Sequence, residues 1–286
     1  MNYSYKITIA DLLFEICSQR ALWTDPALRP FLQDREAAVR LSVEVSWAYD
    51  RAPQICTAPL GGDRIQTYYR QDGENLCVLP EGQKGNFSVT VSDPLYRRFR
   101  CYINEKPFLS TPQNLGTVFR MLPMRAILQH HGISFFHASQ IALGEAGILF
   151  TAPSGTGKTT QAKLWREFRG ARIVCNDRVL VKNRCTYGFP LDGSEPVCSA
   201  ERNRLGAIVV LSQSPENRVT RLKPSKALQR LLPQMVVDAW DPDARSCAAD
   251  QLCRLLPEVP VYALECTPTE DAVCCLERQL KKDGVM

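Results

Sequence analysis

The sequence predicts a mixed α/β fold with a β-rich N-terminal region, and two observations lead to this prediction. From residue 133 onward, short apolar stretches typical of buried strands alternate with longer amphipathic stretches typical of helices. One of these strands, residues 148–151, runs directly into a glycine-rich loop that a helix follows. We therefore expect a β-rich region over residues 1–110 and an α/β domain over residues 111–286.

The first 110 residues contain short stretches in which polar and apolar residues alternate, as they do in half-buried strands. Residues 40–47 and 64–70 are clear examples. Turn residues such as Asp72 and Gly73 separate these stretches. We find no group of catalytic side chains in this region, so the sequence predicts its structure but not its role.

A change of pattern marks the boundary near residue 111. Thr111 followed by Pro112 is typical of a helix start, and apolar residues then recur at helical spacing over residues 115–128. Gly132 ends this helix. Pro123 lies inside it and is expected to bend the helix or to split it in two.

The remainder of the chain supplies the strands and helices of the α/β domain. Strands are expected at residues 133–143, 148–151, 172–175, 179–181, 207–211 and 261–264. Helices are expected at residues 158–168, 224–232 and 270–280. This order of strands and helices favours a phosphate-loop topology at the centre of the domain.

The loop that joins the strand at 148–151 to the helix at 158–168 has the composition of a phosphate-binding loop. The widely used pattern is G-x-x-x-x-G-K-[ST], and here only the first glycine is replaced, by Ala152. Gly155 and Gly157 allow backbone N–H groups to turn inward around an anion. The residues expected to bind the nucleotide are Ser154, Gly155, Thr156, Gly157, Lys158, Thr159 and Thr160.

Two residues of this loop indicate ATP and Mg²⁺ as the ligands. Lys158 supplies a compact positive charge for the β- and γ-phosphates, and the hydroxyl group of Thr159 is placed to bind Mg²⁺. A second metal ligand is usually an acid at the end of a neighbouring buried strand. Asp177 follows the strand at 172–175, so we expect it to bind the metal ion. The alternative is a turn in which Asn176 and Asp177 only reverse the chain.

His137 is a further catalytic candidate beside Lys158 and Asp177. It lies on the strand before the phosphate-loop strand, where alternation places His137 and Ser139 on one face. Histidine titrates near neutral pH, which suits proton transfer. The alternative is a hydrogen-bonded core residue without a chemical role, the common state of a lone histidine in an apolar strand.

Composition and charge limit the classes of partner. The chain has 286 residues, 45% hydrophobic and 23% charged, and its formal net charge of +5 is spread along its length. The densest basic stretch, residues 96–100, fits the solvated face of a strand, so we expect no nucleic-acid partner. No apolar run is long enough to span a bilayer, and the N-terminus lacks the apolar core of a signal peptide. Twelve cysteines without a repeated spacing fit reduced thiols. We therefore expect a cytoplasmic protein without a membrane partner.

The residues around the phosphate loop resemble those of the HPr kinase/phosphorylase family. The resemblance covers about residues 118–280 and is carried by the segments 136–139, 152–160 and 174–179. The loop is also similar to that of ATP-dependent phosphoenolpyruvate carboxykinase, a structural relative of these kinases. The likeness extends to shorter bacterial HPr-kinase-like proteins, some of which accompany ribosomal-peptide biosynthesis. Residues 1–110 show no such resemblance.

The resemblance implies a P-loop kinase core of the HPr kinase/phosphoenolpyruvate carboxykinase type. It assigns Lys158 and Thr159 to the phosphates and Mg²⁺. It also assigns Asp177 as the second acid of a catalytic pair and His137 as an active-site residue. The first acid of that pair, the family's general base, is replaced here by Asn176, whose amide does not accept a proton. Members of the family are often oligomeric, so the resemblance also implies a homo-oligomer.

The leading hypothesis from the sequence is a kinase that transfers the γ-phosphoryl group of ATP to a hydroxyl group of a peptide, protein or small molecule. Loose phosphoryl-transfer transition states need positioning and charge neutralisation more than a strong base, so Asn176 is compatible with this hypothesis. The alternative is a nucleotide-binding regulatory or accessory protein with little turnover. A motor-type or transport ATPase is disfavoured, because the sequence contains no second nucleotide-binding motif and no signature loop.

Overall fold

The computed structural model describes residues 2–33, 36–80, 86–108, 113–190 and 198–286. They form two compact units, here called unit 1 and unit 2. Unit 1 comprises Met1–His131 and Asp238–Pro242, and unit 2 comprises Gly132–Val237 and Asp243–Met286. Each unit is built on a large β-sheet, and the fold is mixed α/β, as the sequence predicts. Among the described residues, no helix is both long and apolar enough to cross a bilayer.

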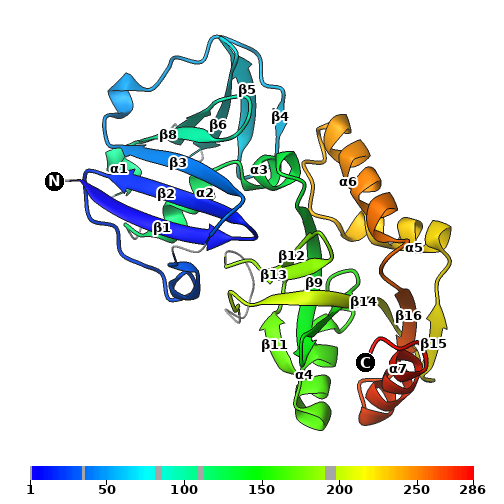
Figure 1. Ribbon diagram of the computed structural model, residues 1–286. Coiled ribbons are helices and arrows are strands. Elements are labelled where there is room, and N and C mark those ends of the chain that lie inside the picture. Colours follow the sequence, from blue (N-terminus) through cyan, green and yellow to red (C-terminus); the bar gives the residue numbers. More distant parts are fainter. Residues whose placement is uncertain (1, 34–35, 81–85, 109–112, 191–197) are drawn as a thin grey trace. The chain divides into compact units, whose positions relative to one another are not determined.

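Unit 1 contains an eight-stranded sheet in which neighbouring strands follow the order β1-β2-β3-β8-β7-β6-β5-β4 (Figure 1). Its strands are β1 (Tyr3–Ile9), β2 (Leu12–Ser18), β3 (Val39–Ser46), β4 (Gly61–Gly62), β5 (Thr67–Gln71), β6 (Glu74–Pro80), β7 (Asn86–Ser92) and β8 (Arg98–Ile103). Its helices are α1 (Glu105–Phe108), α2 (Leu115–Met121) and α3 (Met124–His130). The N-terminal region is therefore β-rich, and the strand predicted at 40–47 is β3.

Helix α2 packs against this sheet and α3 follows it within unit 1, which moves the boundary between the units. The rings of Phe14 and Phe119 lie 5.0 Å apart, and the hydroxyl group of Thr90 donates to the carbonyl oxygen of Met121 at 3.0 Å. The boundary falls after His131 and not near residue 111, because α2 covers the unit 1 sheet and α3 belongs to the same unit. Pro123 splits the predicted helix in two. The helix start predicted at residues 111–112 lies outside the described residues.

Unit 2 contains a second sheet with the order β10-β9-β12-β13-β14-β16-β15, in which β11 pairs with β9 and β10 also pairs with β14. Its strands are β9 (Ser134–Leu143), β10 (Ala146–Thr151), β11 (Arg172–Cys175), β12 (Arg178–Lys182), β13 (Cys185–Gly188), β14 (Arg202–Gln213), β15 (Arg218–Arg221) and β16 (Val261–Cys266). Its helices are α4 (Lys158–Arg169), α5 (Pro224–Leu231), α6 (Pro242–Leu255) and α7 (Glu270–Lys282). Short 3₁₀ turns of the chain lie at Arg29–Phe31, Tyr49–Arg51 and Leu232–Gln234.

The strands and helices predicted for this part of the chain are all present, and three further elements were not predicted. Strands β13 and β15 have four residues each, too few for a clear alternation. Helix α6 buries Ala244, Ala248 and Leu252. Because two of these three buried residues are alanines, the apolar period of α6 is weak in the sequence.

The core of unit 2 lies on both faces of the parallel strands β10, β14 and β16. Phe150 faces α4 and α7, where it packs with Trp165 and Leu276. Leu149, the next residue along the strand, faces the opposite side and belongs to a cluster with Leu252 of α6. Strand β10 is therefore buried on both faces, which explains its continuous apolar sequence. The carboxyl ends of these parallel strands meet at one edge of the sheet, and the glycine-rich loop follows β10 there.

Candidate functional site

The glycine-rich loop joins the end of β10 to the start of α4 through two glycines in left-handed conformations. The φ angles are +78° at Gly155 and +116° at Gly157, values that side chains disfavour. A Cβ atom placed on Gly155 would meet no heavy atom within 4 Å. The space in front of the loop is thus open at the position where an anion would approach the backbone.

Helix α4 begins directly after the loop, with Gly157 at its N-cap. No side chain among the described residues caps this end of the helix. The first N–H groups of a helix have no partner within the helix, and they carry the positive end of the helix dipole. Together with the loop, the start of α4 is suited to bind a phosphate group.

Lys158, the first residue of α4, is folded back onto the loop. Its side chain is almost buried, with the whole residue 7% exposed. Its Nζ atom donates to the carbonyl oxygens of Ala152 at 2.9 Å and Pro153 at 3.3 Å. Burial lowers the pKa of Lys158, and the charge of Arg178 lowers it further. The ammonium group is therefore held at the loop by two carbonyl groups that a phosphate oxygen could replace.

Asp177 lies between two side chains that it can bind electrostatically. Its Oδ1 atom is 3.1 Å from Nε2 of His137, and its Oδ2 atom is 3.3 Å from Nη1 of Arg178. Two hydrogen bonds fix the turn that carries it. The N–H group of Ala138 donates to the carbonyl oxygen of Asp177 at 3.2 Å, and the hydroxyl group of Ser139 donates to that of Asn176 at 3.0 Å. The turn thus holds the carboxylate beside β9.

His137 is half-buried on β9, and its pKa is lowered from its ordinary value. Burial is the main cause, followed by the positive charge of Lys158, and both outweigh the attraction of Asp177. The ring is therefore neutral at pH 7. With the Nε2 proton directed at Asp177, Nδ1 is the ring nitrogen able to accept a proton. His137 lies beside the loop, because it lines the same pocket as Ser154.

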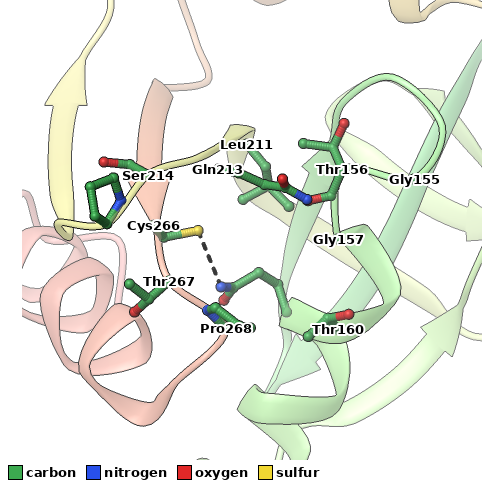
Figure 2. Close-up of a pocket in the computed structure, with 12 residues that line it drawn as sticks. Gly155, Thr156, Gly157, Thr160, Leu211, Gln213, Ser214, Cys266, Thr267 and Pro268 are labelled. Atoms are coloured by element: carbon green, nitrogen blue, oxygen red, sulfur yellow. Dashed lines mark hydrogen bonds between the residues drawn. The ribbon is translucent and has the colours of Figure 1, made fainter.

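A cavity of about 550 Å³, here called the loop pocket, opens beside the loop (Figure 2). Figure 2 shows Thr156 and Thr160 on one side of it and Ser214 and Thr267 on the other. The residues that follow β14 and β16 form the second side: Ser214, Pro215, Thr267 and Pro268. Two hydrogen bonds join the sides, from Gln161 Nε2 to Cys266 Sγ at 3.3 Å and from Gln213 Nε2 to the Thr156 carbonyl oxygen at 3.5 Å.

A second cavity of about 450 Å³, here called the carboxylate pocket, opens at Asp177. His137, Ser154 and Arg178 line it together with Asp177, and residues 233–236 form the remaining lining. Polar groups from β9, the loop and β12 therefore meet in one hollow. The two pockets share no lining residue, and the loop contributes to both.

The structure brings the predicted site residues together at one edge of the unit 2 sheet. Gly155, Thr156, Gly157 and Thr160 line the loop pocket, whereas Ser154, His137 and Asp177 line the carboxylate pocket. Lys158 and the partly exposed Thr159 lie at the start of α4. No group of three or more His, Cys, Asp or Glu residues suited to a metal ion occurs among the described residues. A metal ion here would need phosphate oxygens as additional ligands, which is how Mg²⁺ is usually bound.

The sequence did not predict which distant segments complete the lining of each pocket. Residues 213–215 and 266–268 follow predicted strands that are parallel in the structure, and the carboxyl ends of parallel strands meet at one edge of a sheet. Residues 233–236 give no such signal, because they follow a helix and come close to His137 only through the tertiary fold. Arg178 is next to Asp177 in the sequence, but the sequence does not predict the ion pair between their side chains.

Compared with models of known protein families and with curated proteins, the chain matches none.

Proposed function

We propose that this protein binds ATP with Mg²⁺ at the glycine-rich loop and transfers the γ-phosphoryl group to a hydroxyl group. The observation that carries the proposal is the position of the loop between two pockets. One pocket has room for a nucleoside, and the other brings a histidine and a carboxylate together beside Lys158. We also propose that unit 2 is a P-loop kinase core of the type that the sequence resembles.

The loop supports binding of a triphosphate through its backbone and its charge. Gly155 and Gly157 turn the backbone around open space, and α4 contributes its positive end. Lys158 lies where it can exchange its bonds with loop carbonyls for bonds with β- and γ-phosphate oxygens. The loop pocket offers the apolar surface of Leu211 and the amide group of Gln213 to a nucleoside. Its volume of about 550 Å³ lies within the usual range for small-molecule sites.

Thr159 and Asp177 are the residues that would hold Mg²⁺. A hydroxyl oxygen and a carboxylate are hard ligands, and they leave positions for phosphate oxygens and water. Bound there, Mg²⁺ would neutralise negative charge on the phosphates during transfer. Both oxygens of Asp177 already face cationic or hydrogen-bonding groups, so metal binding would compete with Arg178, whose contact is the longer of the two.

His137 supplies the proton acceptor in this proposal. Its ring is neutral near pH 7, and Asp177 orients it through Nε2 in the way that a carboxylate orients a catalytic histidine. The carboxylate pocket would hold the hydroxyl acceptor, on a peptide, a protein or a small molecule. Ser154 and Arg178 would contact that acceptor, because both line the same pocket.

Asn176 favours a second candidate, a nucleotide-binding regulatory or accessory protein with little turnover. It is 6% exposed, and it stands where the family that the sequence resembles has its general base. An amide at this position removes one carboxylate from the site. If phosphoryl transfer required that carboxylate, the protein would bind nucleotide without passing on its phosphoryl group.

A single-turnover assay with γ-labelled ATP separates the two candidates. Label is followed into hydroxyl-bearing peptides, proteins and small molecules, with the wild-type chain and Asn176→Asp in parallel. Transfer by the wild-type chain, with Lys158→Ala as the inactive control, is the result expected of a kinase. Tight ATP binding without transfer to any acceptor class, even in Asn176→Asp, would favour the accessory protein.

A further inference from the structure

Two cysteines face each other across a short β-bridge beside the carboxylate pocket. Cys175 is the last residue of β11 and forms an isolated antiparallel bridge with Cys198. Both thiols are free, and Cys175 is 2% exposed whereas Cys198 is partly exposed. The thiol of Cys175 donates to the carbonyl oxygen of Arg178 at 2.9 Å. The bridge therefore places the two cysteines directly opposite each other in the reduced protein.

The backbone register at this bridge suits a disulfide. The N–H group of Ser199 donates to the carbonyl oxygen of Val174 at 2.8 Å, so this bond joins residues beside the pair and not the two cysteines. In antiparallel strands this arrangement marks the closely spaced pairs, whose Cα atoms are about 4.5 Å apart. Disulfides join residues with Cα atoms about 4.4–6.8 Å apart. The two sulfur atoms can therefore bond without a large movement of the backbone.

Gly188 at the end of β13 makes room for Cys198. A Cβ atom on Gly188 would lie 2.6 Å from Sγ of Cys198 and 2.5 Å from the carbonyl oxygen of Ser199. Real Cβ atoms do not approach other atoms so closely, so a larger residue would displace the Cys198 segment. The position of the Cys198 thiol thus depends on a glycine in a neighbouring strand.

Two buried cysteines of unit 1 provide a contrast. Cys77 of β6 and Cys101 of β8 both lie opposite Thr90, which belongs to the strand between them. Their backbones are two strand spacings apart, about 9–10 Å, which is beyond the reach of a disulfide. Burial alone therefore does not bring two thiols close enough to form a disulfide. The strand register does so for Cys175 and Cys198.

We propose that Cys175 and Cys198 form a reversible dithiol–disulfide site that a peroxide oxidises. One sulfur, as the thiolate, attacks an oxygen atom of hydrogen peroxide. The S–O bond forms, the O–O bond breaks, and the departing hydroxide takes the proton of that thiol to become water. The second sulfur, as the thiolate, then attacks the sulfenic sulfur, forming the S–S bond and breaking the S–O bond. The leaving hydroxide takes the second proton, so two thiols lose two electrons and the peroxide becomes two water molecules.

The position of the site gives the disulfide a consequence. Asp177 lies two residues after Cys175, at the turn that leads into β12. A bond from Cys175 to Cys198 would join the strand end that carries this turn covalently to the segment before β14. The site therefore places a covalent constraint next to the carboxylate pocket. It does not depend on the phosphoryl transfer proposed above.

The test is a mass-spectrometric map of cysteines in the full chain after treatment with about one equivalent of hydrogen peroxide. We expect a cross-linked peptide pair that contains Cys175 and Cys198, that has lost two hydrogens, and that dithiothreitol separates. Cys77 and Cys101 should remain free thiols. Full alkylation of Cys175 and Cys198 while exposed cysteines such as Cys56 become oxidised would overturn the proposal. Equal cross-linking of many cysteine pairs in the folded chain would overturn it as well.

Three variants test whether the strand register, and not thiol reactivity alone, determines which cysteines form the disulfide. Cys198→Ser should abolish the cross-link at Cys175, and Gly188→Ala should lower its yield at least severalfold by displacing Cys198. Cys253→Ser, which removes an exposed thiol elsewhere in unit 2, should leave the yield within about twofold of the wild-type value. A full cross-link yield in a folded Gly188→Ala variant would contradict the role of the register. In the chain unfolded in guanidinium chloride, peroxide should no longer cross-link Cys175 and Cys198 in preference to other cysteines.

Discussion

Both carboxylate oxygens of Asp177 are in contact with neighbouring side chains. His137 and Arg178 each face one of its oxygens, and the charge of Lys158 reaches both His137 and Asp177. A carboxylate in this setting can hold a metal ion or orient the imidazole ring, and the two roles use different oxygens. Substitution at each position separates them.

Replacing Asp177 with asparagine should keep nucleotide binding and weaken the response to Mg²⁺. An amide can hold the turn, because the turn is fixed by its backbone carbonyl, but it does not neutralise a divalent cation. We expect the Mg²⁺ concentration for half-maximal turnover to rise by at least roughly 10-fold. Glu167→Gln on the exposed side of α4 is the matched control. Normal turnover of Asp177→Asn at limiting Mg²⁺ would mean that the metal ion is held elsewhere.

Replacing His137 with glutamine should remove the ascending limb of the pH–rate profile. The pKa of His137 lies below 6.5, the ordinary value for histidine. The ring is therefore in its neutral, proton-accepting form at pH values above 6.5. Turnover of the wild-type chain should therefore rise with pH through a midpoint below 6.5 and then level off. In His137→Gln we expect a flat profile in this window and a turnover lower by roughly two to four orders of magnitude.

The control for this experiment is His130→Gln, which alters an exposed histidine of unit 1. It should reproduce the wild-type profile. If His137→Gln kept the ascending limb, another group would be responsible for it, and His137 would be a structural residue of β9.

At the scale of elements, the loop before α4 and the end of α4 each contain a glycine, and the two glycines have different roles. Gly155 in the loop and Gly170 at the end of α4 both have positive φ angles, +78° and +63°, and a Cβ atom on either would meet nothing within 4 Å. Their backbone requirements are thus alike. They differ in what lies in front of them, because Gly155 lines the loop pocket.

This likeness makes Gly155→Ala and Gly170→Ala a matched pair. Each should lower the free energy of unfolding by roughly 1–2 kcal/mol, because a side chain disfavours the left-handed conformation. Only Gly155→Ala should also weaken ATP binding, since its methyl group would enter the space proposed for the phosphates. Chemical denaturation and calorimetric titration measure the two effects. Equal ATP affinities in both variants would show that the phosphates do not lie against Gly155.

The sequence predicted the elements of unit 2 well where their patterns were long or chemically distinctive. The apolar strand at 148–151, the loop and α4 are local features, and their periods and glycines are visible in the sequence. The second sides of the pockets are not local, because residues 233–236 approach His137 only through tertiary packing. Helices α2 and α3 belong to unit 1 and not to the α/β domain predicted from residue 111 for the same reason: their period is visible, but the sheet against which α2 packs is not.

At the scale of the whole molecule, the two units are interleaved along the chain. Asp238–Pro242 belongs to unit 1 although the chain on either side belongs to unit 2. Within unit 1, Asp238 pairs with Arg125 at 2.8 Å, and the ring of Trp240 lies 5.1 Å from that of Tyr68. Gly61 leaves room for this tryptophan, since a Cβ atom there would lie 2.4 Å from its ring.

Gly61→Ala should therefore destabilise unit 1 without changing nucleotide binding. The added methyl group would collide with the ring of Trp240, which costs about 1–3 kcal/mol as other overpacked sites do. Thermal denaturation should show the loss. The dissociation constant of ATP, measured well below the transition, should stay within about twofold of the wild-type value, because the proposed site lies within unit 2. A matching loss of ATP affinity would indicate that unit 1 takes part in binding.

The central claim is that the loop at 154–160 binds a nucleoside triphosphate through Lys158, and calorimetric titration with ATP and Mg²⁺ tests it most directly. We compare the wild-type chain with Lys158→Ala and with Lys163→Ala, which removes an exposed lysine from the same helix. Binding to the wild-type chain should be retained within about twofold in Lys163→Ala. In Lys158→Ala it should weaken by roughly 100-fold or more, since a charged hydrogen-bond donor to the phosphates is lost. Equal ATP affinity in a folded Lys158→Ala variant, or no binding by the wild-type chain, would contradict the claim.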